Sequence, residues 1–295
     1  MLAERGTPGR CMAVRGGRRA AGLTAAAAAA ARLAAAVLPL VALCAGVGAA
    51  VAGGVGAVAG VAVAAVVLAA VGTYCDRLAL SAMAARPVSE VEHPELYRLV
   101  RELSKGGRLP VPRLFVSPAE QPNSFAVGRN PRTAAICCTE GLLASLDEAE
   151  LRGVLGHELA HVSGPDILPA TMSAGLATVI TFPAGLRVVG APLMLVLGPV
   201  AALVIRLSVA RQREYRADAA GALLAGDPVD LAAALRKIEA GVTELALAPD
   251  ARLSSVAHLM IASPFHPEGF ARLFVTQPPA GERLRRLEAL AGYRR

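Results

Sequence analysis

Two histidines and a glutamate in the segment His157-Glu158-Leu159-Ala160-His161 are the residues most able to do chemistry. On a helix, positions i and i+4 lie on one face, so His157 and His161 can both direct a ring nitrogen at one ion. Zinc accepts imidazole nitrogen and, in catalytic sites, keeps a position open for water whose pKa falls to about 7. Glu158, beside the pair, could take a proton from that water. The spacing predicts a hydrolytic zinc site, although a surface helix can carry such a string without function.

A third ligand must come from elsewhere in the chain. Glu214 and Asp218 stand at i and i+4 of another predicted helix, so Glu214 could complete the set and Asp218 could fix the tautomer of a histidine ligand. An equally simple interpretation is that the two carboxylates pair on a solvated face with neighbouring arginines: Arg211, Arg213 and Arg216. The remaining histidines are weaker candidates: His93, His258 and His266.

The composition places this chemistry at a membrane. The chain has 295 residues, of which 55% are hydrophobic and none is tryptophan, and its mean hydropathy of +0.51 is high for a soluble globule. Arginines crowd the first 32 residues ahead of an apolar run, which is typical of a cytoplasmic flank and not of a nucleic-acid surface. Five cysteines without CxxC spacing indicate neither a disulfide framework nor a zinc knuckle, which favours a reducing compartment.

Two long uncharged stretches predict the membrane segments. The first is twice too long for one span and has a glycine-rich middle, which predicts helices over 33–52 and 55–74; a signal peptide is the rival interpretation. The second, 167–186 and 188–205 separated by Arg187, is either another membrane hairpin or a pair of buried helices. Either alternative returns the chain to the same side, as contact between Glu214 and the histidines requires.

The polar segment between these stretches predicts a helix and a small sheet. Apolar residues at helical spacing predict a helix over 94–107, and short β-rich pieces predict antiparallel strands at 113–117, 124–128 and 133–138. Ser145 and Glu148 form a predicted capping box at the start of the histidine helix.

Several stretches in the same order resemble a known family. They are ARPVSEVEHPELYRLV, PNSFAVGRNPRTAAICCTEGLL, HELAH with Asp166 after it, REYRADAAGA and ARLFVTQPPAGERLRRLEAL. Together they resemble the membrane-integral M48 zinc peptidases and, within them, the bacterial HtpX-type heat-shock proteases. The resemblance implies two N-terminal spans, a cytoplasmic zinc domain, one Zn²⁺ per subunit and Glu214 as the third zinc ligand.

The resemblance also suggests substrate-binding residues. PNSFAVG resembles the family's edge strand, which pairs with substrate backbone, so Asn123 and Ser124 become candidates, with an ordinary edge strand as the alternative. Gln277 stands where the family usually has a histidine thought to lie near the active site. Glutamine still donates a hydrogen bond but carries no charge. Arg283 matches the family's following arginine, and a solvated helix charge is its alternative interpretation.

We therefore expect an α+β protein: a mostly helical zincin-like metalloprotease domain with a small antiparallel sheet, an N-terminal transmembrane hairpin and a second hydrophobic helix pair. The expected regions follow the chain in this order: a basic tail at 1–32, two transmembrane helices at 33–75, the first part of the protease domain at 76–166, the hydrophobic pair at 167–205, and the rest of the domain at 206–295.

The expected function is a zinc endopeptidase in a bacterial plasma membrane, crossing it more than once, with its active site facing the cytoplasm. It would cut unfolded or misfolded membrane and soluble proteins, contacting lipid but no nucleic acid; the sequence leaves its oligomeric state open. The alternatives are a pseudo-protease that holds membrane clients with structural zinc, and a transport or structural membrane protein with a fortuitous motif. The apolar runs hold essentially no ionisable residues, which argues against transport.

Overall fold

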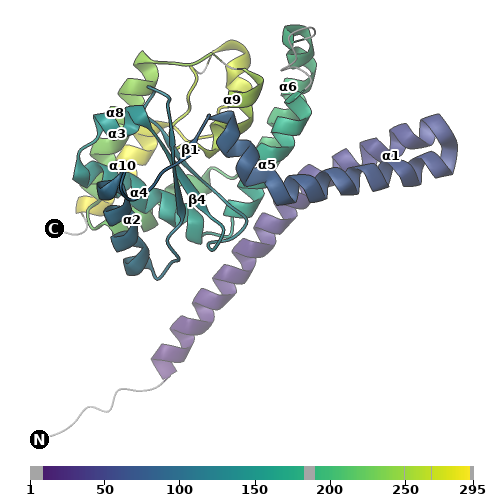
Figure 1. Ribbon diagram of the computed structural model, residues 1–295. Helices are drawn as coiled ribbons and strands as arrows, with labels where there is room; N and C mark the ends of the chain where they lie inside the picture. The colour runs from purple at the N-terminus through teal and green to yellow at the C-terminus, as the bar shows by residue number, and fades with distance from the viewer. Residues whose placement is uncertain (1–8, 183–189, 249, 267, 293–295) are drawn as a thin grey trace, which may run out of the picture.

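A computed structural model describes residues 9–182, 190–248, 250–266 and 268–292. A long helical hairpin projects from a body in which helices surround a small sheet (Figure 1). The largest buried cluster joins α2, the sheet, α4, α8 and α10, and it includes Leu99, Ile136, Leu155 and Leu235. The described residues are therefore mostly helical with a small sheet, and the zincin-like character of the body remains a prediction.

The N-terminal apolar run forms helix α1 (Gly9–Ala82), which turns back on itself at Ala52 and Gly53. Gly53 has φ +60°, a left-handed conformation that glycine adopts without a steric cost. The two arms approach so closely that a Cβ on Gly48 would lie 2.0 Å from the Gly56 carbonyl oxygen. The turn thus lies where the glycine-rich middle predicted it. Among the described residues, Ala27–Ala82 is the segment long and apolar enough to cross a membrane.

The sheet is mixed, and the prediction of an antiparallel sheet was wrong. Its strand order is β1-β2-β4-β3, and β2 runs parallel to β4 while the other two pairs are antiparallel. The reason is that β3, which lies between β2 and β4 in sequence, is placed on the far side of β4. The strand bounds are Arg86–Pro87 for β1, Arg113–Ser117 for β2, Ser124–Val127 for β3 and Ala135–Thr139 for β4.

Helix α4 (Glu148–Ser163) carries the histidine motif, and its predicted cap was wrong by two residues. Asp147 is the N-cap: its Oδ1 accepts a hydrogen bond from Glu150 N at 3.0 Å, and its own N donates to Glu150 Oε2 at 3.0 Å. Ser145 instead is the last residue of the preceding helix, where its hydroxyl donates to the Gly141 carbonyl. The remaining helices of the body are α2 (Pro94–Gly107), which matches its prediction, α3 (Glu140–Ser145), α7 (Gln212–Ala225), α8 (Pro228–Glu244), α9 (Ala251–Val256), η2 (Ala257–Leu259), η3 (Gly269–Leu273) and α10 (Ala280–Gly292).

Helices α5 (Ile167–Thr181) and α6 (Gly190–Ser208) correspond to the second apolar stretch. Arg187, the predicted boundary between them, lies outside the described residues. Most of α5 is buried by protein, and a Cβ on its Gly175 would meet Val71 at 2.8 Å and Cys75 at 3.0 Å in α1. This burial agrees with the buried-helix alternative for α5, and both helices return the chain to the body where α7 begins.

Candidate metal centre

The centre is built where α4 crosses α7, and two glycines make the crossing possible. A Cβ on Gly221 would lie 2.5 Å from the backbone nitrogen of His157, and one on Gly156 would lie 2.6 Å from the Gly221 carbonyl oxygen. Real Cβ atoms do not approach backbone this closely, so neither position has room for a side chain. The backbone of His157 therefore rests directly against α7, within reach of the carboxylates of that helix.

His157, His161 and Glu214 converge with the spacing of a metal-ligand set. The Nε2 atoms of the two histidines are 3.1 Å apart, and they lie 3.5 and 3.6 Å from the two carboxylate oxygens of Glu214. The three side chains are largely buried, and their ligand atoms lie within 4.8 Å of one another. Zinc–nitrogen bonds of about 2.0–2.1 Å in a tetrahedral site place donor atoms about 3.3 Å apart, which these distances match. Donor types and spacing thus fit a zinc ion.

The charges at the centre are distributed unequally over the two histidines. Burial alone would lower the pKa of His157, but hydrogen bonds with Asp218 and Glu214 raise it to about 9. Burial and the Arg213 charge lower the pKa of His161 to about 4. Burial alone would raise the pKa of the Glu214 carboxyl, whereas the two histidines and Arg213 hold it well below its usual range. The Glu214 carboxylate is consequently anionic, and the histidine pair carries at most one positive charge at neutral pH.

Glu158 is fully buried beside this set. Its Oε1 accepts a hydrogen bond of 2.6 Å from the Ser124 hydroxyl on β3. Its Oε2 is buried and has no hydrogen-bond partner among the described residues. Burial raises the pKa of this carboxyl. Ser124 thus holds one oxygen of Glu158 and leaves the other available for a water or a substrate proton.

Asp218 connects the histidines to a second buried charge. Its Oδ1 lies 2.9 Å from His157 Nδ1, the nitrogen that points away from the ligand set. Arg283 on α10 donates to both Asp218 oxygens, at 2.8 and 2.7 Å, and to the Ile261 carbonyl at 2.5 Å. Burial would raise the pKa of Asp218, but Arg283 outweighs it and lowers the pKa to about 2. Arg283 is therefore buried against Asp218 and is not a solvated helix charge, and its role in substrate binding stays a prediction.

The other predicted substrate residues lie around β3 and η2. β3 is the edge strand, as predicted, but a neighbouring segment covers its first residues: Ile261 N donates to the Ser124 carbonyl at 3.0 Å, and Asn123 Nδ2 donates to the Ala262 carbonyl at 3.0 Å. Gln277 Nε2 donates to the carbonyls of Ala257 and Met260, at 2.6 and 3.1 Å. The structure thus uses the Gln277 amide to hold η2 and does not bring it into the ligand set.

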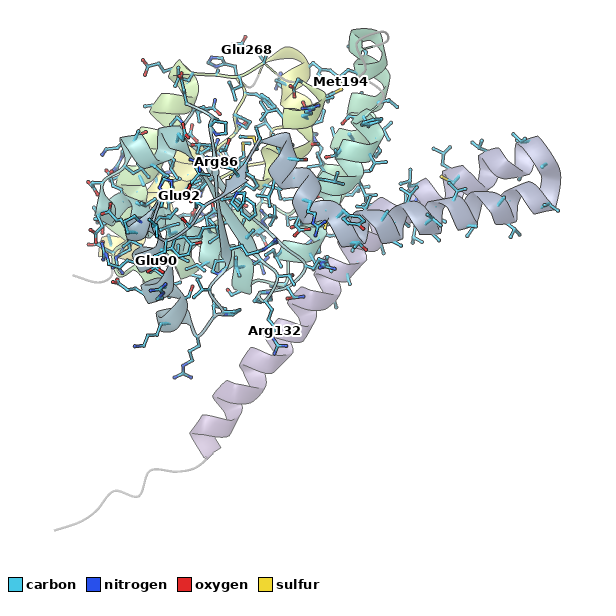
Figure 2. All side chains as sticks on the ribbon, viewed as in Figure 1. Arg86, Glu90, Glu92, Arg132, Met194 and Glu268 are labelled. Carbon is cyan, nitrogen blue, oxygen red and sulfur yellow. The ribbon has the colours of Figure 1, made fainter. Side chains whose placement is uncertain are left out.

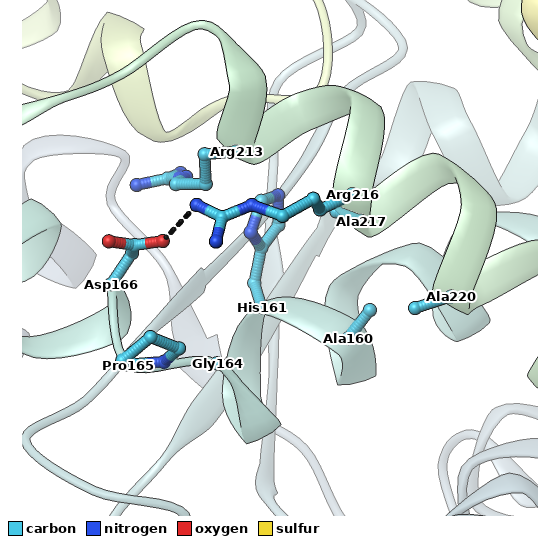
Figure 3. Close-up of a pocket in the computed structure, with 9 residues that line it drawn as sticks. All are labelled: Ala160, His161, Gly164, Pro165, Asp166, Arg213, Arg216, Ala217 and Ala220. Atoms are coloured by element: carbon cyan, nitrogen blue, oxygen red, sulfur yellow. Dashed lines mark hydrogen bonds and ion pairs between the residues drawn. The ribbon is translucent and has the colours of Figure 1, made fainter. Parts of the chain in front are cut away.

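A pocket opens beside His161, with a cavity volume of about 180 Å³ (Figure 3). The sequence did not indicate it, although Arg213, the residue next to Glu214, was the available signal. Its walls come from the end of α4 and one face of α7, and they comprise Ala160, His161, Gly164, Pro165, Asp166, Arg213, Arg216, Ala217 and Ala220.

Comparisons with known proteins identify the family of this chain. The model of the family described as Peptidase family M48 matches residues 90–291. A "Protease HtpX homolog" of Kineococcus radiotolerans is 54% identical over 236 residues, which cover 74% of this chain and 80% of that protein. Proteins of the same name from Paenarthrobacter aurescens (51% over 229 residues, 74% and 79% covered) and Thermococcus kodakarensis (40% over 236 residues, 74% and 81% covered) are also similar. The chain therefore belongs to peptidase family M48, and within it to the HtpX-type proteases.

Proposed function

We propose that this protein is a membrane-anchored zinc endopeptidase that hydrolyses unfolded or misfolded polypeptides. The single observation that carries the proposal is the convergence of His157, His161 and Glu214 at ligand spacing, with an unpartnered carboxylate oxygen of Glu158 beside them. A binding module needs no such unpartnered base next to its metal ligands. Hydrolysis does need one.

Each residue of the centre has a distinct chemical task. Zinc held by the two histidines and Glu214 would supply an activated water and polarise the peptide carbonyl. Glu158 takes the proton of the attacking water on its free Oε2 and passes it to the leaving amine, and its raised pKa suits both steps. Ser124 keeps the carboxylate in place through Oε1. Asp218 Oδ1 lies 2.9 Å from His157 Nδ1, and a proton shared there would fix the tautomer that presents Nε2.

The apolar hairpin supports a membrane location with the centre on the side of the N-terminal segment. The hairpin turns at Gly53, so both arms run back toward the body, and the first arm continues past it toward the N-terminus (Figure 1). Arg32, within the first arm, lies 3.3 Å from Asp166. Under the positive-inside rule, the basic N-terminal region and the body would then face the cytoplasm of a bacterial cell. Side chains along the hairpin are almost all carbon, unlike those around the body (Figure 2).

Metal analysis paired with Glu158→Gln tests this function. The purified full-length protein should hold about one zinc and degrade a loosely folded substrate such as casein. Glu158→Gln should lower cleavage by a factor on the order of 10² to 10⁴ and leave the zinc content unchanged, because it removes the base but no ligand. Glu214→Ala should lose zinc as well as cleavage.

Other outcomes would change the assignment. Full zinc occupancy without cleavage of any unfolded substrate would favour a scaffold that uses zinc structurally. Undiminished activity of Glu158→Gln would refute the proposed mechanism.

A further inference from the structure

The pocket beside His161 has the features of a ligand subsite. Part of its lining consists of small residues, Ala160 of α4, Gly164 just after that helix, and Ala217 and Ala220 of α7. Two arginines of the same α7 face, Arg213 and Arg216, also line it (Figure 3). His161 belongs both to the pocket lining and to the candidate ligand set. Whatever enters this pocket therefore comes next to the metal centre.

Arg213 is a buried cation with unused donors. Only 6% of its surface is exposed, and its Nε donates to Glu214 Oε1 at 3.2 Å. Within the part of the chain that the structure describes, no hydrogen bond or ion pair involves its two terminal nitrogens, and neither is among the enclosed polar atoms that lack a partner, so both keep contact with solvent. Donors of a guanidinium that stay open to solvent can meet an anion there. Because Arg213 lines the pocket, an anionic ligand in the pocket is well placed to meet them.

The pocket lining already contains one carboxylate, that of Asp166, paired with arginines. The carboxylate of Asp166 lies 3.0 Å from Arg216 and 3.3 Å from Arg32. Around the pocket, three guanidinium groups face two carboxylates, those of Asp166 and Glu214, which leaves one positive charge in excess. An arginine fork binds a carboxylate through two parallel hydrogen bonds. The excess positive charge and the free donors of Arg213 both favour binding of a further carboxylate.

We propose that this pocket is a substrate subsite that binds a carboxylate of the polypeptide, held by Arg213 and Arg216 beside the metal centre. The carboxylate is either the side chain of an aspartate or glutamate or the free C-terminus of the chain. The proposal rests on the proposed function, since it assigns a preference to the same active site: cleavage next to an acidic group.

Binding of matched peptides tests the subsite without relying on catalysis. The full-length protein in detergent, with Glu158→Gln to stop turnover, is titrated with fluorescent peptides that differ only in Glu or Gln at one scanned position and have amidated C-termini. At one position, Glu should bind on the order of tenfold more tightly than Gln, because a charge-assisted hydrogen bond replaces a neutral one. An all-Gln peptide with a free C-terminus distinguishes the second source of the carboxylate.

Variants of the pocket should change this preference in opposite directions. Arg213→Gln should abolish it, and Arg216→Gln, whose side chain is 53% exposed and therefore replaceable without burial cost, should reduce it. Asp166→Asn should strengthen it, because the competing carboxylate is removed. The matched control is Arg236→Gln, an exposed arginine that pairs with Glu288 far from the pocket. Zinc content and thermal unfolding show that each variant is folded.

Two results would overturn the subsite. One is equal affinity for Glu and Gln peptides at every position and for both kinds of C-terminus. The other is a loss of turnover in the Arg213 and Arg216 variants, made in the active protein, that is equal for all peptides, since the arginines would then act on the reaction itself. Casein hydrolysis without any carboxylate preference refutes only the subsite, whereas the preference without hydrolysis refutes only the protease.

Discussion

The α4–α7 crossing and the α1 hairpin both depend on close glycine contacts between helices, but these contacts have opposite results. In both, glycines let two helices approach until backbone nearly touches backbone, at Gly156 and Gly221 in the body and at Gly48 and Gly56 in the hairpin. Inside the body, this contact encloses charged and polar groups. Along the hairpin, it turns apolar side chains outward.

The surroundings of the two contacts explain the difference. Val51, Val55 and Val58 of the hairpin expose 82%, 81% and 72% of their surface, whereas Glu158 and Asp218 expose 0% and 3%. An apolar surface that continues along a whole helical arm is stabilised where lipid replaces water, and buried carboxylates are stable only where each finds a partner. The stability of the hairpin thus depends on a lipid environment, and the stability of the metal centre depends on the partners of its buried charged groups.

Removing one partner at the centre should have the largest effect. Arg283→Gln leaves Asp218 buried without its counter-charge, so we expect the free energy of unfolding to fall by about 3–5 kcal/mol and zinc affinity to fall about 10- to 100-fold. Thermal unfolding and competition with a chelator measure both. The matched control is Arg285→Gln on the same helix, whose side chain is 75% exposed and whose pair with Glu282 contributes little. Equal effects of the two substitutions would show that the buried chain from Arg283 to His157 is unimportant.

An arginine on the hairpin should be costly only in lipid. We expect Val66→Arg, which lies near the middle of the second arm with 69% of its surface exposed, to disfavour membrane insertion by about 2.5–3.5 kcal/mol, because a charge then faces hydrocarbon. Val91→Arg is the control, since Val91 exposes 93% of its surface on the body. Fractionation of cells expressing each variant measures insertion. Normal membrane recovery of Val66→Arg would contradict the placement of this arm in hydrocarbon.

A methyl group at the α4–α7 crossing should separate the helices. Gly221→Ala places a Cβ against the His157 backbone, which should cost about 1–3 kcal/mol and weaken zinc binding by shifting α7. Gly281→Ala has open space around its Cβ and should not destabilise the protein. Unfolding curves and zinc content of the two variants measure these effects. A Gly221→Ala variant with unchanged stability and normal zinc content would mean that the crossing relaxes without moving the ligands.

The smallest effect should be the pH dependence of the metal-free protein. The raised pKa of His157, about 9, gives stability that is complete below about pH 6.5 and is lost as the pH rises through 9. The lowered pKa of His161, about 4, acts in the opposite sense, since the unfolded chain binds a proton between pH 6.5 and 4 that the folded chain does not. Melting temperatures should therefore peak near pH 6.5 without metal. With zinc, which needs both imidazoles neutral, the alkaline decline should disappear.

Local signals predicted the elements that carry the chemistry. The spacing of His157 and His161 depends only on the helical repeat, and the amphipathic pattern of 94–107 and the strand at 113–117 depend on side-chain periodicity, so these were found correctly. The hairpin turn was found because glycine alone tolerates φ +60° cheaply. The capping box failed, because Ser145 and Asp147 are both good caps and only the end of α3 decided between them.

The partnerships between distant segments could not be derived in this way. Sequence proximity does not tell that β3 lies beyond β4, that Arg283 reaches Asp218, or that Gln277 is bonded to the carbonyls around η2. Each of these depends on which faces meet, and packing of the whole core determines that.

The sequence by itself determined the two histidine donors and the apolar arms of the hairpin. The helical repeat aligns His157 with His161, and a long uncharged apolar run is not stable when exposed to water. Only the tertiary structure decided how those donors are used. The glycine contact at Gly221 brings Glu214 and Asp218 to the histidines, and the same contact sets Arg213 into a pocket beside them. The physical reason is that a metal centre needs atoms within a few ångströms, and segments some fifty residues apart in sequence reach that distance only by folding.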